Sequence, residues 1–145
     1  MAQLSVPAVT DRLGELREFV EMQGRQAGLE STRLAAVHLV VEETAVNIIS
    51  YAYPDAPGML TVSCRANETE FVVELADVGI LFDPTAAPVP DTTLPLEERS
   101  AGGNGLILIR RYCDGLSWRR ESGRNILTCR FTLHSPAIRP IGRRP

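Results

Sequence analysis

Residues 40–55 read VVEETAVNIISYAYPD and place three polar side chains in an apolar run. Glu43 and Asn47 are four residues apart, so on an α-helix they lie one above the other on a single face, with Glu42 rotated away. An acid and an amide on a largely apolar face are costly to bury unless a partner, such as a metal-bound phosphate, pairs with them. The alternative is a solvated stripe without a ligand. This helix alone leaves both interpretations open.

The composition of the chain describes an ordinary globular domain. It has 145 residues, of which 44% are hydrophobic, enough to bury a core without metals or disulfides. We therefore expect one domain over residues 1–145, with its core at about 6–133 and a frayed tail at 134–145. The 15 cationic residues are all arginine and stand against 18 acidic ones, so direct nucleic-acid binding is not expected. The lack of lysine in this sequence also excludes a Walker-type phosphate loop and Schiff-base chemistry.

The cysteines indicate neither a zinc site nor a disulfide framework. Cys64, Cys113 and Cys129 are widely spaced and form no Cys-x-x-Cys pair. His38 and His134 are the only histidines that could join them, so free, buried thiols are expected. The first residues lack a basic start followed by an apolar core, and no apolar run reaches the roughly 18 residues of a membrane span. A cytoplasmic protein with no membrane partner is therefore expected.

Hydrophobic periodicity predicts two helices in the first third of the chain. Apolar residues recur at three- and four-residue steps from residue 13, after a Thr10-Asp11 start signal, and this first helix ends near residues 24–28. The second helix follows a cap signal at Ser31 or Thr32 and stops before Pro54. Its predicted core-facing residues are Leu34, Val37, Val41, Ala45 and Ile48.

Alternation of apolar and polar residues predicts two hairpins later in the chain. Segments 59–64 and 70–76 form the first, and segments 116–120 and 126–133 form the second, joined by the turn ESGRN. Between the hairpins, residues 83–104 hold four prolines and a glycine cluster, which predicts a long irregular loop whose position favours a lid. The stretch GLILIRRYC after it predicts a short helix opened by glycines.

Two further motifs bear on the question raised by Glu43 and Asn47. Asp77 ends an apolar strand and is followed by Gly79, where the backbone can approach a flat ligand while the carboxylate accepts from an exocyclic amine. The stretch SAGGNGLILI then places glycines at a helix N-terminus, where unpaired backbone N–H groups and the helix dipole favour phosphate. Each motif alone is also typical of a plain turn or a flexible loop. Found together and in this order along one chain, the three stretches are a specific signal.

At these residues the chain resembles the GHKL ATPase superfamily, and within it the small anti-sigma factor serine kinases of bacteria. EETAVNIISYAY is similar to the superfamily's Glu-x-x-x-Asn box, DVGILFDP to Asp-x-Gly-x-x-Phe-Asp-Pro, and GGNGLILI to Gly-Gly-x-Gly-Leu-x-Leu-Ile. The resemblance runs from about residue 6 to residue 133. It implies an α/β (α+β) two-layer sandwich of the Bergerat ATP-binding type, with a mixed or antiparallel sheet, helices on one face and a lid over ATP.

The resemblance also implies a role for each matched residue. At the phosphate end, Asn47 would hold the Mg²⁺ that bridges the phosphates of ATP, and Glu43 would be the catalytic base toward the acceptor hydroxyl. The phosphate-facing turn under the lid would be formed by Gly102, Gly103 and Gly105.

At the adenine end, the resemblance makes Asp77 the acid that reads the base and Gly79 its close-approach partner. Thr128, on the last strand, would back the adenine through its hydroxyl. An ordinary strand threonine is an equally good interpretation of Thr128.

The function that the resemblance implies is phosphorylation, with ATP, of a serine on an anti-sigma factor antagonist protein. A sigma factor and a second copy of the chain are the further partners that it implies. A nucleotide-gated binding module without phosphoryl transfer is the main alternative. A sensor histidine kinase fragment is disfavoured, because its phospho-accepting histidine would lie on a preceding helix, whereas His38 lies inside the motif helix and is expected to be a packed or capping residue.

Overall fold

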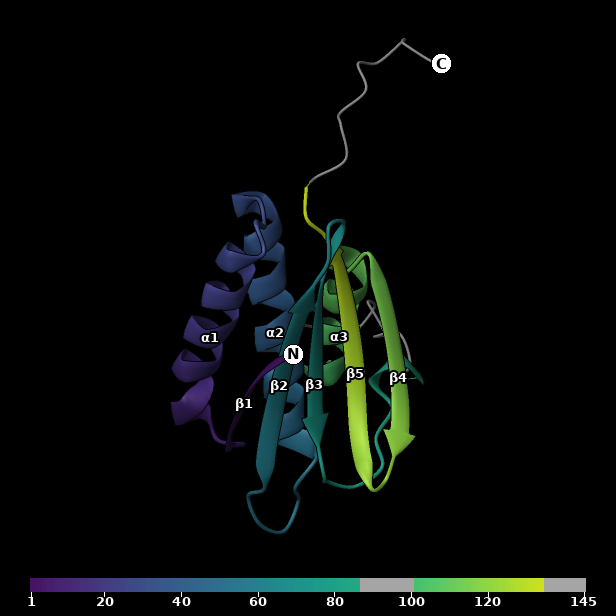
Figure 1. The fold of residues 1–145 in the computed structure, drawn as a ribbon. Helices are drawn as coiled ribbons and strands as arrows, with labels where there is room; N and C mark the ends of the chain where they lie inside the picture. The colour runs from purple at the N-terminus through teal and green to yellow at the C-terminus, as the bar shows by residue number, and fades with distance from the viewer. Residues whose placement is uncertain (87–100, 135–145) are drawn as a thin grey trace.

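The computed structural model describes residues 1–86 and 101–134, with the side chains of 101–106 left out of that description. In this part of the chain, three α-helices lie on one face of a five-stranded sheet, as Figure 1 shows. The elements in chain order are β1 (Ala2–Pro7), α1 (Leu13–Gln26), α2 (Ser31–Tyr51), β2 (Met59–Ala66), β3 (Glu70–Asp77), α3 (Ala101–Tyr112), β4 (Gly115–Glu121) and β5 (Arg124–Thr132), with short 3₁₀ turns η1 (Thr10–Arg12) and η2 (Pro84–Ala86). The predicted two-layer α+β class is confirmed.

The sheet has the strand order β1-β2-β3-β5-β4, and every neighbouring pair is antiparallel. Both predicted hairpins are present. The second one turns at Ser122 and Gly123, whose φ angles of 51° and 76° lie in the left-handed region used by tight two-residue hairpin turns. Strand β1 was not predicted, although its six residues AQLSVP alternate Ala2, Leu4 and Val6 with Gln3 and Ser5.

Both N-terminal helices form where the periodicity predicts them. Helix α2 is the centre of the helical layer, and the residues predicted to face the core are all buried. Its length and its mean hydropathy of 1.2 over 18 residues would also suit a membrane span, but half of that window is buried inside this fold. The apolar character of α2 is therefore explained by its place in the core.

The core lies between the helices and the inner face of the sheet. Its largest fully buried side chains are Phe71, Phe131, Leu16, Leu60 and Leu75. Free thiols are confirmed for all three cysteines, but the predicted burial holds only for Cys64 and Cys129, since Cys113 is partly exposed. Burial raises the pKa of the Cys64 thiol to about 12. The predicted lid falls mostly on residues 87–100, which are outside the described residues, as is the predicted tail from residue 135 onward.

Candidate nucleotide-binding site

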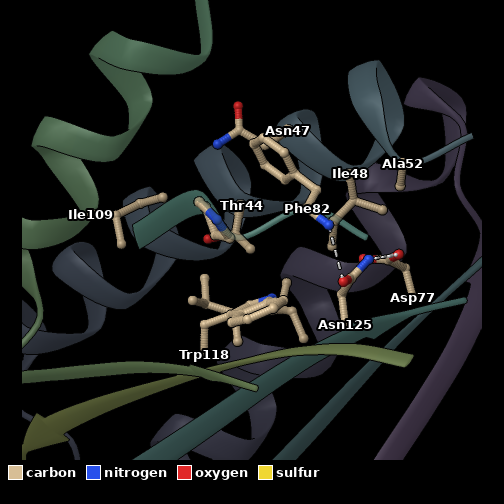
Figure 2. Close-up of a pocket in the computed structure, with 12 residues that line it drawn as sticks. Thr44, Asn47, Ile48, Ala52, Asp77, Phe82, Ile109, Trp118 and Asn125 are labelled. Carbon is tan, nitrogen blue, oxygen red and sulfur yellow. Dashed lines mark hydrogen bonds between the residues drawn. The ribbon is translucent and has the colours of Figure 1, made fainter. Parts of the chain in front are cut away.

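A cavity opens between α2, α3 and the inner face of the sheet. Its empty volume is about 400 Å³ counted to its open mouth. Residues from α2, β3, β4, β5 and α3 and from the segment after β3 line it: Thr44, Asn47, Ile48, Ala52, Leu75, Asp77, Phe82, Pro84, Ile109, Trp118, Asn125 and Leu127. Figure 2 shows the labelled side chains around this space.

The floor of the cavity follows from the register of three strands. Leu75 on β3 is paired with Leu127 on β5, which is paired with Trp118 on β4. Two residues along, and therefore on the same face, Asp77 is paired with Asn125. The sheet thus presents an apolar row followed by a polar pair, with the polar pair at one end of the cavity and Ile109 at the other (Figure 2).

The helix side of the cavity comes from one face of α2. Thr44, Asn47 and Ile48 follow the three- and four-residue spacing that keeps side chains on one face. Glu43 is one turn before Asn47 but does not line the cavity, and its side chain is partly exposed. Glu42 points elsewhere, since its Oε1 accepts a hydrogen bond from Arg17 Nη2 of α1 at 3.1 Å. The two neighbouring acids therefore face different surroundings, as the helical geometry predicts.

Asp77 and Asn125 form a buried hydrogen-bonded network at the closed end of the cavity. Asp77 Oδ1 accepts from the Gly79 N–H at 2.9 Å and from Asn125 Nδ2 at 2.9 Å. Asn125 Nδ2 also donates to the Ile80 carbonyl at 2.7 Å, and Asn125 Oδ1 accepts from the Phe82 N–H at 3.3 Å. Among the described residues, every hydrogen bond to the Asp77 carboxylate goes to Oδ1. Oδ2 is therefore the oxygen that can accept from a ligand.

Thr128 is not brought to the cavity. Its hydroxyl donates to Glu74 Oε2 at 3.0 Å and accepts from Arg119 Nη1 at 3.4 Å. Thr128 is three residues from Asn125, and an odd offset along a strand puts two side chains on opposite faces of the sheet. The ordinary strand threonine is thus the interpretation that its placement supports, and Asn125 is the residue of β5 that meets Asp77.

The backbone at Gly79 lies close to another part of the protein, the Ala52 carbonyl, and not to the cavity. A Cβ atom at this position would lie 2.2 Å from the Ala52 carbonyl oxygen, and Gly79 is not among the residues that line the cavity. The same segment is held by Tyr53, whose hydroxyl accepts from the Val78 N–H at 2.9 Å and donates to the Met59 carbonyl at 2.5 Å. Burial raises the pKa of the Tyr53 phenol above its ordinary value, and the Val78 hydrogen bond opposes that shift. The end of α2 therefore fixes the segment that follows Asp77.

The three predicted phosphate-facing glycines lie inside α3 rather than before it. Because α3 begins at Ala101, Gly102 and Gly103 are in its first turn, where backbone N–H groups have no acceptor within the helix. Gly105 is in the second turn, where its N–H can bond to the Ala101 carbonyl. Two of the three glycines thus keep the position that anion binding needs.

The buried polar side chains also gather around this cavity. Six polar or charged residues are buried among those described, and four of them line the cavity: Thr44, Asn47, Asp77 and Asn125. Asn125 was not predicted as a site residue from the sequence, because it was taken as the last residue of the ESGRN turn. A two-residue turn at Ser122 and Gly123 would have paired Asn125 with Arg120 and directed its side chain to the same face as Leu127.

Comparison with known proteins identifies the family. The profile described as histidine kinase-like ATPase domain matches residues 6–131. The chain belongs to this family. It is 36% identical over 136 residues to the serine/threonine-protein kinase BtrW of Bordetella bronchiseptica, with 92% of each chain covered. It is 26% identical to the serine-protein kinase RsbW of Halalkalibacterium halodurans, over 83% of this chain and 76% of that protein.

A solved structure agrees with the fold. The crystal structure of the RsbU and RsbW domains of Rv1364c from Mycobacterium tuberculosis matches with a TM-score of 0.60 and 13% identity. The match covers 94% of this chain and 34% of that longer chain. The sequence-based prediction of the GHKL superfamily and its serine kinases is confirmed by these matches.

ATP is the ligand that the histidine kinase-like ATPase family implies, and the chemistry of the cavity lining suits its base. The apolar floor suits a flat ring, and the free side of the Asp77 carboxylate suits an exocyclic amine. The described residues contain no group of three or more His, Cys, Asp or Glu side chains that could hold a metal by themselves. A magnesium site here fits one amide ligand, from Asn47, completed by phosphate oxygens and water.

Proposed function

We propose that this chain is an ATP-dependent serine kinase whose substrate is an anti-sigma factor antagonist protein. The observation that carries the proposal is the different placement of two residues on α2. Asn47 is buried and lines the cavity, whereas Glu43, one turn earlier, lies outside the cavity lining and is partly exposed. A group outside the nucleotide cavity can meet a hydroxyl that arrives on a second protein. The serine kinase names of the relatives support this class of reaction.

Each part of the site has a separate task in this proposal. Bound ATP supplies the phosphoryl group to be transferred. Asp77 accepts a hydrogen bond from the exocyclic amine of the base, and the first-turn N–H groups of α3 face the phosphates. Asn47 provides the amide oxygen for Mg²⁺, and Glu43 accepts the proton of the serine hydroxyl. Catalysis is then mostly positioning and charge stabilisation, as expected for phosphoryl transfer.

The alternatives predict different behaviour of the same residues. A nucleotide-gated binding module needs the cavity but not Glu43. A histidine kinase fragment needs a phospho-accepting histidine on a helix that precedes the nucleotide-binding motifs. His38 is partly buried beside α1, with its Nε2 at 3.5 Å from Glu21 Oε1. That packing supports the structural role predicted for His38.

The proposal extends to partners and location. A sigma factor bound in competition with the antagonist, a homodimer, and a cytoplasmic site of action are parts of it that the serine kinase class suggests. Light scattering of the purified chain tests the dimer directly, because it gives the mass in solution.

The deciding experiment uses purified chain, labelled ATP, Mg²⁺ and candidate antagonist proteins encoded near it in the genome. We expect label on a serine of one candidate, and far slower labelling when Glu43→Gln replaces the wild type. Nucleotide-dependent complex formation without any label on the partner would support the binding module instead. Absence of ATP binding would remove both functions.

A further inference from the structure

Two buried polar atoms have no hydrogen-bond partner in the part of the chain that the structure describes. They are Thr44 Oγ1 and Trp118 Nε1. Buried polar groups in folded proteins are paired in the large majority of cases, so each exception requires an explanation. Both residues line the cavity that Asp77 and Asn125 close at one end. Figure 2 shows Trp118 on the sheet side of this space and Thr44 between it and the helix side.

Solvent exposure does not explain the missing hydrogen-bond partners, because both atoms are buried. Thr44 is 4% exposed, so water does not replace the missing hydrogen bond at its surface. A threonine inside a helix commonly donates to the carbonyl four residues earlier, but the Thr44 hydroxyl does not. An indole N–H is a donor with no other role, and burying one unpaired is unfavourable. Two such groups facing one cavity are most simply explained by a ligand that pairs with them.

The chemistry of a purine complements these groups. Asp77 can accept from an exocyclic amine, but the ring nitrogens of the base are acceptors and need donors. Asp77 and Asn125 are both engaged at the closed end of the cavity. Trp118 lies on the neighbouring strand, paired with Leu127 rather than with Asn125. Its N–H is therefore placed to meet a different edge of the base from the one that Asp77 reads.

We propose that Trp118 and Thr44 form a second base-recognition pair. Trp118 Nε1 donates to an unprotonated ring nitrogen of the purine, and the Thr44 hydroxyl bonds to the same base from the α2 side. The inference rests on the proposed binding of ATP and adds the residues that read the ring nitrogens. The exocyclic amine stays with Asp77.

The test combines one variant with base analogues. ADP and its 1-deaza, 3-deaza and 7-deaza analogues, each with one ring nitrogen replaced by C–H, are titrated into wild type and Trp118→Phe by calorimetry. We expect the wild type to bind one analogue about tenfold more weakly than ADP, the scale of one lost hydrogen bond. Trp118→Phe keeps an aromatic ring but lacks the donor, so it should bind ADP and that analogue equally.

The outcomes separate the two levels of the proposal. If the wild type binds no adenine nucleotide, the proposed function fails and this inference falls with it. If ADP binds and every deaza penalty is the same in both proteins, only the Trp118 assignment fails. Trp118 is the single tryptophan of the chain, so its fluorescence gives a readout on the unaltered protein. Emission that ADP leaves unchanged would also overturn the contact.

Thr44→Val tests the other half with nearly the same side-chain shape. If the Thr44 hydroxyl bonds to the base, the variant should bind ADP several-fold more weakly. The melting temperature of the free protein should rise, because an unpaired buried hydroxyl has been removed. A lower melting temperature with unchanged ADP affinity would show that Thr44 is a structural residue and would exclude it from the pair.

Discussion

The base end of the cavity and the Glu43–Asn47 face of α2 differ in how their polar groups are held. At the base end, Asp77 and Asn125 are 6% and 5% exposed and share a network of short hydrogen bonds with the segment from Gly79 to Phe82. On α2, Asn47, which lines the cavity, and Glu43, which lies outside it, form no hydrogen bond or ion pair with a described residue through their side chains. The protein therefore holds Asp77 and Asn125 in place by itself and leaves Glu43 and Asn47 available to a ligand.

This contrast separates two kinds of substitution. A change at the base end alters a network that also supports the fold, so it affects nucleotide affinity and stability together. A change at Glu43 or Asn47 removes a group that no described residue depends on, so it should affect chemistry or metal use with little loss of stability. The predictions below test this separation.

Glu43→Gln should have the largest effect. The substitution keeps the shape of the side chain but removes the proton acceptor, so phosphoryl transfer to the protein substrate should slow by roughly 100-fold or more. ATP affinity and melting temperature should stay near the wild-type values. The measurement is the single-turnover transfer rate at saturating ATP.

Glu42→Gln is the matched control for this prediction. Glu42 is the adjacent acid, but it pairs with Arg17 on the surface between α1 and α2, where an exposed ion pair contributes little. Its loss should change the transfer rate by much less. Equal effects of the two substitutions would remove Glu43 from catalysis and favour the nucleotide-gated binding module.

Asp77→Asn should weaken nucleotide binding by about 1–3 kcal/mol. The remaining carbonyl oxygen can still accept from Gly79 and Asn125, but the new amide directs a donor at the exocyclic amine of adenine. Thr128→Val is the control, because Thr128 contacts Glu74 on the opposite face of the sheet. The assignment fails if Asp77→Asn binds adenine and guanine nucleotides as the wild type does, or if Thr128→Val is the more damaging change.

Gly79→Ala should reduce the free energy of unfolding by about 1–3 kcal/mol, the usual range for forcing an atom into a packed site. The new Cβ would lie 2.2 Å from the Ala52 carbonyl oxygen, so the backbone has to shift. Gly14→Ala is its control, because Gly14 lies in α1 with nothing within 4 Å of the added atom. That substitution should be neutral or stabilising by at most about 1 kcal/mol. Urea denaturation of the two variants gives the comparison, and similar losses would contradict the packing role of Gly79.

The sequence predicted the elements better than it predicted the faces of the strands. The helices and both hairpins follow from local patterns, because periodicity and turn residues act over a few neighbours. Strand β1 was missed because its pairing with β2 joins residues some sixty positions apart, as in Ala2 with Cys64.

The same dependence on distant strand pairing explains which site residues could be predicted from the sequence. Glu43, Asn47 and Asp77 were identified because each belongs to a compact motif. Thr128 was named from the resemblance and Asn125 was not considered. The side of the sheet that a residue faces depends on register, and register depends on the turn geometry at Ser122 and Gly123. Trp118 was not identified either, since its relation to Asp77 passes through two strand pairings.

Asn47→Ala should have the smallest effect of the four and the most specific one. If the Asn47 amide oxygen is a ligand of Mg²⁺, its removal should weaken ATP binding about tenfold when Mg²⁺ is present. In the presence of a chelator, the loss should be much smaller, because the base end is unchanged. Calorimetric titrations with and without the metal measure the difference. Val46→Ala is the neighbouring control, since Val46 is 39% exposed and points away from the cavity lining. An equal loss with and without Mg²⁺ would show that Asn47 supports the cavity as a structural residue, and the two ends of the site would then not differ in the way their hydrogen bonds indicate.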